Sequence, residues 1–354
     1  MTIATRLALQ RIPIALSMMN QITRHYSGNG RKITQIVSPK QSGPINRLIG
    51  TVDIDGSGTE HSLEECNPFM LLDAGIISKG GLPKFGAHPH RGHSVVTLLL
   101  QGKVESWDSF HDGKTIIRGP ASYWVDAGSG LFHNEMTIID DESADPLQHC
   151  KLMQLWISVK EEDRLKSPTV QHDTNLPVEE ALNSEGDIIG SIRYFIGKGG
   201  SISTPHPITV AHVTQDSGTT LQFPIQSEYG GFLVHLGGCA TYGNDSDTET
   251  KETYAVHVLD DDTDESYLHI TTPAAVSDKS KTSYLVCVGE KINEPWYKKL
   301  TSNGAVVAKS KEEAREIATK VEEYSKEGLS SGNLLRLESC NGILLSINHG
   351  YHYH

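Results

Sequence analysis

Two short strings constrain this chain more than any other feature: HPHRG at residues 88–92 and HNEM at residues 133–136. Each string carries two good metal ligands at positions i and i+2, His88 with His90 and His133 with Glu135. On a β-strand, side chains at i and i+2 point to the same face. Two such strands side by side would direct three imidazoles and one carboxylate at one point. That set suits a divalent transition metal, and iron(II) in particular if a coordination position stays open. The strings therefore predict β-strands that hold one metal ion.

Chance has to be weighed, because the 354 residues include 17 histidines. His352 and His354 form another such pair at the C-terminus, and we interpret it as a coincidence. The internal pairs differ because strand-like apolar runs adjoin them and glycines bracket the turns. We therefore expect a metal site at the internal pairs only.

The rest of the chain is typical of an all-β protein with two domains. Its 33 glycines and 15 prolines are spread along the sequence, and short apolar runs recur between turn residues, as in sandwiches and barrels. The runs cover residues 94–100, 104–110, 121–125 and 152–159, and then 208–213, 219–223, 231–236, 254–259, 267–271 and 283–288. A charged, turn-rich stretch at 160–187 separates the two series. The chain is long enough for each series to build its own core.

The second half differs from the first in its histidines. Residues 188–330 contain no His-x-His or His-x-Glu pair, so we predict that this half binds no metal. His235 and His257 stand alone and are interpreted as core or surface residues. A helix is predicted after Ser310, which forms a capping box with Glu313. Apolar residues then recur at helical spacing, and Gly328 is expected to end the helix.

The chain resembles the pirin family, which are bicupins of the cupin superfamily. The similarity rests on FGAHPHRGHSVVTLLLQGKVES at residues 85–106 and WVDAGSGLFHNEM at residues 124–136, with NPFMLLDAG at 67–75 and QLWISV at 154–159. It implies an all-β fold of two cupin-like antiparallel β-barrels with a C-terminal helix. The metal-binding N-terminal cupin domain would span residues 46–165, a connection 166–187, and a metal-free C-terminal cupin domain 188–330. Residues 331–354 form a tail beyond the resemblance.

The resemblance also implies ligands and activities. Carried over residue by residue, the family's metal ligands are His88, His90, His133 and Glu135, and the expected cofactor is Fe(2+), with other divalent transition metals as alternatives. Some pirins are quercetin 2,3-dioxygenases, which implies a dioxygenase for a chelating phenol or flavonol, with Glu135 also as catalytic base. Pirin is described as an iron-dependent transcription cofactor too. The alternative is therefore a non-enzymatic, redox-sensing regulator with a protein partner, and we expect a monomer.

The chain departs from the family beside these motifs. Pirins usually continue HPHRG with Phe-Glu, where this chain has His93 and Ser94, and Asp126 replaces a usual Thr. None of the three is a family ligand, so metal binding should survive while the preferred substrate differs. On a regular strand His93 would point away from His90. We therefore expect it at the surface or behind the ligands.

Charge divides the chain unevenly. The net charge is −13, which argues against direct nucleic-acid binding through phosphates. The first 52 residues contain no acid, which is typical of an organellar transit peptide. We predict a dispensable basic leader at 1–45 with mitochondrial import and cleavage after Tyr26. A disordered basic tail, on a protein of the cytoplasm and nucleus, is the alternative. No apolar run is long enough to span a membrane, and the five scattered cysteines are expected to be free thiols.

Overall fold

The structure is a computed structural model. It describes residues 30–42, 45–50, 66–77, 87–111, 113–138, 150–243, 249–260, 263–274, 281–301, 304–331, 337–340 and 343–345. The predicted cleavage point after Tyr26, the leader up to residue 29 and the pair His352 and His354 lie outside the described residues.

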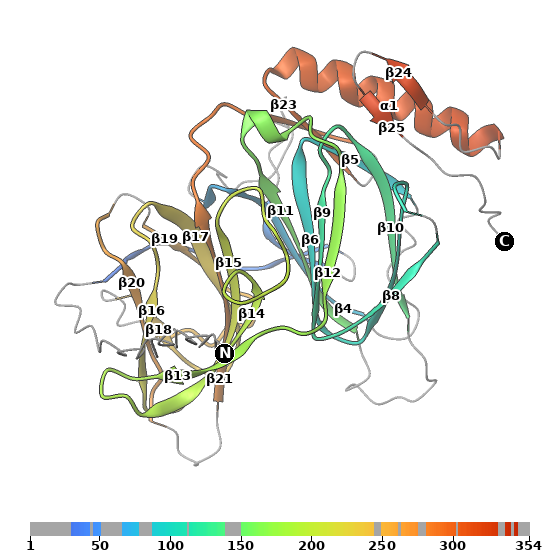
Figure 1. Cartoon of the computed structure of the whole chain (residues 1–354). Helices are drawn as coiled ribbons and strands as arrows, with labels where there is room; N and C mark the ends of the chain where they lie inside the picture. Colours follow the sequence, from blue (N-terminus) through green and yellow to red (C-terminus); the bar gives the residue numbers. More distant parts are fainter. Residues whose placement is uncertain are drawn as a thin grey trace, which may run out of the picture.

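The strands form two units that lie side by side (Figure 1). The first unit has a seven-stranded and a six-stranded sheet. Its seven-stranded sheet runs in the order β12 (Thr169–Asp173), β9 (Ala121–Asp126), β6 (His93–Gln101), β11 (Cys150–Ser158), β4 (Phe69–Ile77), β3 (Ile45–Ile49) and β2 (Lys40–Ser42). Its six-stranded sheet runs in the order β22 (Tyr297–Leu300), β23 (Ala305–Ala308), β5 (His88–Arg91), β10 (Leu131–Ile138), β7 (Lys103–Asp108) and β8 (Thr115–Arg118).

The second unit repeats this plan with a seven-stranded and a three-stranded sheet. The larger sheet runs in the order β1 (Ile33–Val37), β19 (Val256–Leu259), β17 (Tyr229–Gly237), β21 (Lys281–Glu290), β15 (Ile208–Asp216), β14 (Ile188–Ile196) and β13 (Val178–Leu182). The smaller sheet runs in the order β16 (Thr220–Pro224), β20 (Tyr267–Thr271) and β18 (Thr241–Tyr242). A 3-10 turn, η3 (Glu161–Asp163), follows β11 at the start of the connection, and a hairpin of β24 (Leu337–Cys340) and β25 (Ile343–Leu345) lies in the tail.

Three apolar cores explain the strand patterns. One core lies between the two seven-stranded sheets and takes Val96 and Leu98 from β6. Another lies inside the first unit and takes Val95 and Leu99 from the same strand, and a third lies inside the second unit. Successive side chains of a strand point to opposite faces, so a strand covered on both faces needs a continuous apolar run. This is why the central strands are apolar without alternation.

Each unit also receives a strand from the far end of the chain. β1, from the predicted leader, pairs with β19 of the second unit, and β2 pairs with β3 of the first. β23, which follows the last strand of the second unit, pairs in parallel with β5, with Ala305 opposite His90. β1 and β23 thus each pair with a unit outside whose predicted range, 188–330 or 46–165, they lie. The described part of the leader is built into two sheets, which argues against its being dispensable.

Helix α1 (Lys311–Ser331) packs on β22 and β23 at one end of the six-stranded sheet (Figure 1). The predicted start is confirmed, because the backbone N–H of Glu313 donates to Ser310 Oγ at 3.1 Å. The apolar positions of the helix pack against Phe132 and β23; they are Ala314, Ile317, Ala318 and Val321. The predicted end is wrong, because the helix continues through Gly328 to Ser331.

The fold class is confirmed in part. The described residues are mostly β with one α-helix, but every sheet has two end strands and none closes on itself among these residues. The units are therefore stacked open sheets, and closure into barrels is not confirmed. Cys66, Cys150, Cys239 and Cys287 are free thiols as expected. Among the described residues, no helix is long and apolar enough to cross a membrane.

Candidate metal centre

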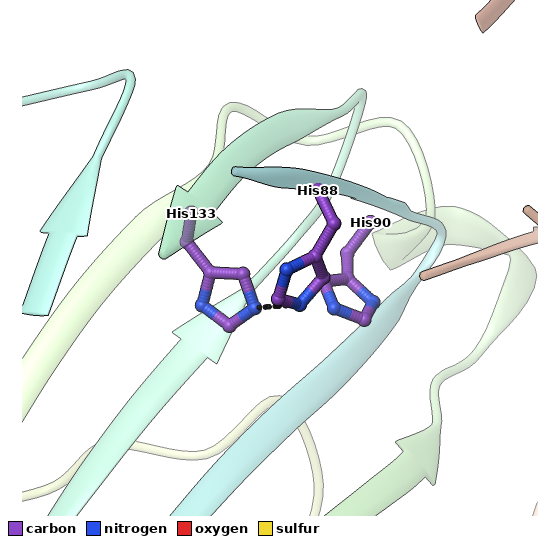
Figure 2. A group of neighbouring side chains, drawn as sticks. All are labelled: His88, His90 and His133. Carbon is purple, nitrogen blue, oxygen red and sulfur yellow. Dashed lines mark hydrogen bonds between the residues drawn. The ribbon is translucent and has the colours of Figure 1, made fainter. Parts of the chain in front are cut away.

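The two strings of the sequence lie on neighbouring strands. β5 and β10 pair antiparallel, with His88 opposite His133 and His90 opposite Leu131. Residues that face each other across a ladder point to the same side of the sheet. The three histidines consequently point into the interior of the first unit, toward the seven-stranded sheet, and their rings gather at one point (Figure 2).

The three rings are close enough to bind one ion. Their nitrogen atoms lie within 4.8 Å of one another, and the Nε2 atoms of His88 and His133 are 3.0 Å apart. The ring centroid of His90 lies 5.1 Å from that of His88 and 4.8 Å from that of His133. His90 and His133 are fully buried. This confirms that the histidines predicted from the strings come together.

The cluster has the properties that a metal site requires. His90 Nε2 and His133 Nδ1 are buried without a hydrogen-bond partner. Burial, followed by the neighbouring histidines, holds the pKa of His90 and His133 well below the usual value. Neutral imidazoles with lone pairs directed at one point are the form that binds a metal. The donor set therefore fits a divalent transition metal.

Glu135 lies beside the histidine cluster and is not one of its members. Its Oε2 is 4.0 Å from His133 Nδ1, and it reaches across to the seven-stranded sheet, where Thr97 Oγ1 and Gln154 Nε2 donate hydrogen bonds to it at 2.6 and 3.0 Å. Burial raises the pKa of Glu135 to about 7, and these two hydrogen bonds oppose that shift. Its predicted roles as ligand and base stay predictions.

Sequence reasoning missed the residues of the opposite sheet. Thr97 and Gln154 face each other in the register of β6 and β11, and Tyr123 lies opposite Thr97 on β9. Burial first, and then the charge of Glu135, raise the pKa of the Tyr123 phenol. No local motif marks these positions. They meet Glu135 only because two sheets are packed face to face.

His93 is the unexpected neighbour of the site. It is buried, with 1% of its surface exposed, and its Nε2 lies 3.0 Å from His90 Nδ1. The strand between them is not regular, because Gly92 has φ +76° and the chain passes there from the six-stranded to the seven-stranded sheet. A surface position for His93 is therefore wrong, and the expected position behind the ligands is correct. Burial lowers its pKa to about 4, so the ring is neutral.

The other two departures from the family form a pair of their own. Ser94 Oγ donates to Asp126 Oδ1 at 2.7 Å, and the indole Nε1 of Trp124 donates to the same oxygen at 2.7 Å. Trp124 belongs to the core between the units. Ser94 and Asp126 thus lie on the face of the sheet that is turned away from the histidines.

The part of the chain that holds this site is similar to known proteins. Residues 52–157 match the family model described as Pirin. A pirin-like protein of Arabidopsis thaliana is 28% identical over 194 residues, which cover 54% of this chain and 60% of the relative. This chain therefore aligns with only about three fifths of that relative's length.

Two solved structures share the fold. A quercetin 2,3-dioxygenase from Acinetobacter baumannii superposes with a TM-score of 0.63 at 21% identity, covering 86% of this chain and all of the other. A bacterial pirin from Escherichia coli, solved in complex with nickel(II), gives a TM-score of 0.50 at 15% identity over 73% of this chain and 99% of the other. The chain is thus similar to pirin-family proteins over the region of the histidine cluster, and it shares the fold of these two solved structures.

Proposed function

We propose that this protein binds one divalent metal ion, iron(II) in its active form, and uses it in the oxygenation of a chelating phenol of the flavonol class. The observation that carries the proposal is the convergence of three buried histidines whose nitrogen atoms lie within 4.8 Å of one another. Two solved structures of the same fold support the proposal. One is named a quercetin 2,3-dioxygenase, and the other, a bacterial pirin, was solved in complex with nickel(II).

Four residues of the first unit would have distinct roles at the metal. His88, His90 and His133 would hold the ion, with Glu135 as the fourth ligand or as a proton acceptor beside it. When bound, iron(II) supplies a Lewis acid and a partner for O2. The first unit's interior excludes bulk water from the cluster, because His90 and His133 are fully buried. A dry site strengthens every charge interaction with a bound phenolate.

Glu135 is our candidate for the base that removes the phenolic proton. The phenol O–H bond would break, its proton would pass to the carboxylate, and the phenolate would keep the electron pair. Support comes from the burial of Glu135, from its pKa of about 7, and from its position 4.0 Å from His133. Thr97 and Gln154 would hold the carboxylate in one orientation while the proton is transferred.

The test is O2 uptake by protein loaded anaerobically with iron(II), with a panel of flavonols and catechols. We expect uptake above that of free iron, at least 100-fold less with His133→Ala, and no change with His172→Ala, an exposed histidine of the same unit. Loaded protein that consumes no O2 above free iron with any phenol would reject the oxygenase. The redox-sensing regulator would then replace it.

A further inference from the structure

His93 and His90 are linked across the interior of the first unit. His93 starts β6 on the seven-stranded sheet, whereas His90 lies on β5 of the six-stranded sheet. His93 Nε2 is 3.0 Å from His90 Nδ1, and His93 Nδ1 is 3.0 Å from the backbone oxygen of Arg91. Trp156 packs against both rings, with its ring centroid 5.2 Å from His90 and 5.5 Å from His93.

For two neutral rings, these contacts assign the positions of the hydrogens. A carbonyl oxygen only accepts, so His93 Nδ1 carries the hydrogen that is donated to Arg91 O. The second nitrogen of that neutral ring, Nε2, is then an acceptor. It follows that His90 Nδ1 carries the hydrogen of the 3.0 Å contact. The remaining nitrogen of His90, Nε2, keeps its lone pair and is the buried atom without a partner in the cluster.

We propose that His93 is a positioning residue for the metal site: it accepts the hydrogen of His90 Nδ1 and thereby holds His90 in the tautomer and orientation that direct the Nε2 lone pair at the metal. The inference rests on the proposed metal binding, and it adds a residue that is not a ligand. A hydrogen bond to the outer nitrogen of a ligating histidine fixes its ring and makes it a better donor.

Gly92 makes this arrangement possible. Its φ of +76° belongs to the left-handed region, which side chains other than that of glycine rarely adopt. A Cβ at this position would lie 2.3 Å from the backbone oxygen of Val307. Two hydrogen bonds join this turn to the loop after β9, from Gly92 N to Gly128 O at 2.9 Å and from Ala127 N to His93 O at 3.0 Å. The turn at Gly92 therefore holds the His93 ring next to the His90 ring.

Two substitutions separate the hydrogen bond from the packing. His93→Phe keeps an aromatic ring against Trp156 and removes the acceptor; it is also the residue that pirins usually carry there. His93→Gln removes the ring and keeps an amide oxygen that can accept from His90 Nδ1. If His93 only filled space beside Trp156, His93→Gln would weaken metal binding more than His93→Phe. If its hydrogen bond to His90 matters, His93→Phe would weaken metal binding more.

The first readout is the affinity for cobalt(II), measured by competition with a chelator at pH 7.5. We expect His93→Phe to bind about 10–100-fold more weakly than wild type, the usual effect of losing such an outer partner. We expect His93→Gln to stay within about threefold of wild type, by the same reasoning. His172→Phe, on the exposed part of β12, should not change the affinity. Equal affinity of His93→Phe and wild type would overturn the proposal, and so would a loss in His93→Gln larger than that in His93→Phe.

The second readout needs no metal and no activity. In metal-free protein with 15N-labelled histidine, long-range 1H–15N spectra report which ring nitrogen carries the hydrogen. We expect His90 to be protonated at Nδ1 in wild type and in His93→Gln, and to become a mixture of tautomers in His93→Phe. A single Nδ1–H tautomer in all three proteins would reject the role of His93. Absent O2 uptake would reject the oxygenase while leaving both readouts intact, so the two proposals can fail separately.

Discussion

Both units bury histidines, but they partner them differently. In the first unit the nitrogens of His88 and His133 face each other at 3.0 Å. In the second unit His235 Nδ1 lies 2.6 Å from Tyr242 OH, and His257 Nε2 lies 3.1 Å from Thr250 Oγ1. His235 and His257 each keep a ring nitrogen without a partner. Among the described residues of the second unit, however, these rings do not form a group of three metal ligands. Burial of imidazoles is thus not enough for a metal site, which needs several lone pairs at one point.

The comparison predicts a large difference in metal binding. Removing a hydrogen-bond partner of a ligating histidine weakens metal binding about 10–100-fold. His90→Ala should weaken cobalt(II) binding by more than this, because it removes one of the three proposed ligands. His235→Ala should keep wild-type affinity. Elemental analysis of untagged protein should find one equivalent of metal in wild type and His235→Ala and almost none in His90→Ala. Two tightly bound equivalents in wild type would show that the units do not differ in this way.

The sequence predicted the cluster because the i, i+2 rule is local and the two strands are neighbours. It placed His88, His90 and His133 correctly and identified the mostly β fold and the start of the helix. It misjudged the surroundings because these depend on contacts across sheets. The predicted orientation of the His93 ring, away from His90, was wrong because the strand breaks at Gly92, where the chain changes sheets.

Strand exchange was equally hidden from local patterns. The pairing of β1 with β19 and of β23 with β5 joins segments that are more than 200 residues apart in the chain. The residue types at 33–37 and 305–308 do not indicate with which strand each segment pairs. Segmentation by composition could therefore find the two series of strands and could not find which strands the units exchange.

The two units should also differ in their dependence on the N-terminal segment. Arg31 is completely buried beside the second unit. Its guanidinium donates to five backbone oxygens, those of Gln226, Ser227, Tyr229, Asp260 and Glu265. Substitution to Leu would leave these part-buried oxygens without their donor, which costs up to about 1–3 kcal/mol for each oxygen that water cannot reach. We expect Arg31→Leu to lower the free energy of unfolding by about 3 kcal/mol or more.

Deletions give a matched comparison at the same place. Removal of residues 1–26, up to the predicted cleavage point, leaves Arg31 and β1 in the chain and should leave the urea midpoint unchanged. Removal of residues 1–45 takes both away and should lower it at least as much as Arg31→Leu does. Lys32→Ala, which changes an exposed neighbour, is the control. If the longer deletion unfolds at the wild-type midpoint, the N-terminal strand is dispensable after all.

Acid should also reveal the cost of a buried histidine in the second unit, where His257 is almost fully buried. Burial, followed by the neighbouring His235, lowers the pKa of His257 from 6.5 to about 4. The unfolded chain then takes up a proton at a higher pH than the folded chain does, so stability is lost as the pH falls from 6.5 to about 4. This difference between the unfolded and the folded pKa of His257 lowers the free energy of unfolding by about 3 kcal/mol at pH values near 4.

His257→Gln should remove this part of the acid sensitivity, since an amide can keep a hydrogen bond to Thr250 Oγ1 and does not titrate. We expect its urea midpoint at pH 7.5 to lie close to that of wild type or below it. The loss in midpoint between pH 7.5 and pH 4.5 should be smaller than in wild type, with both proteins free of metal. The exposed His172→Gln is the matched control and should follow wild type at both pH values. An equal acid loss in His257→Gln and wild type would mean that the titrating groups lie elsewhere, with the histidines of the first unit as the next to test.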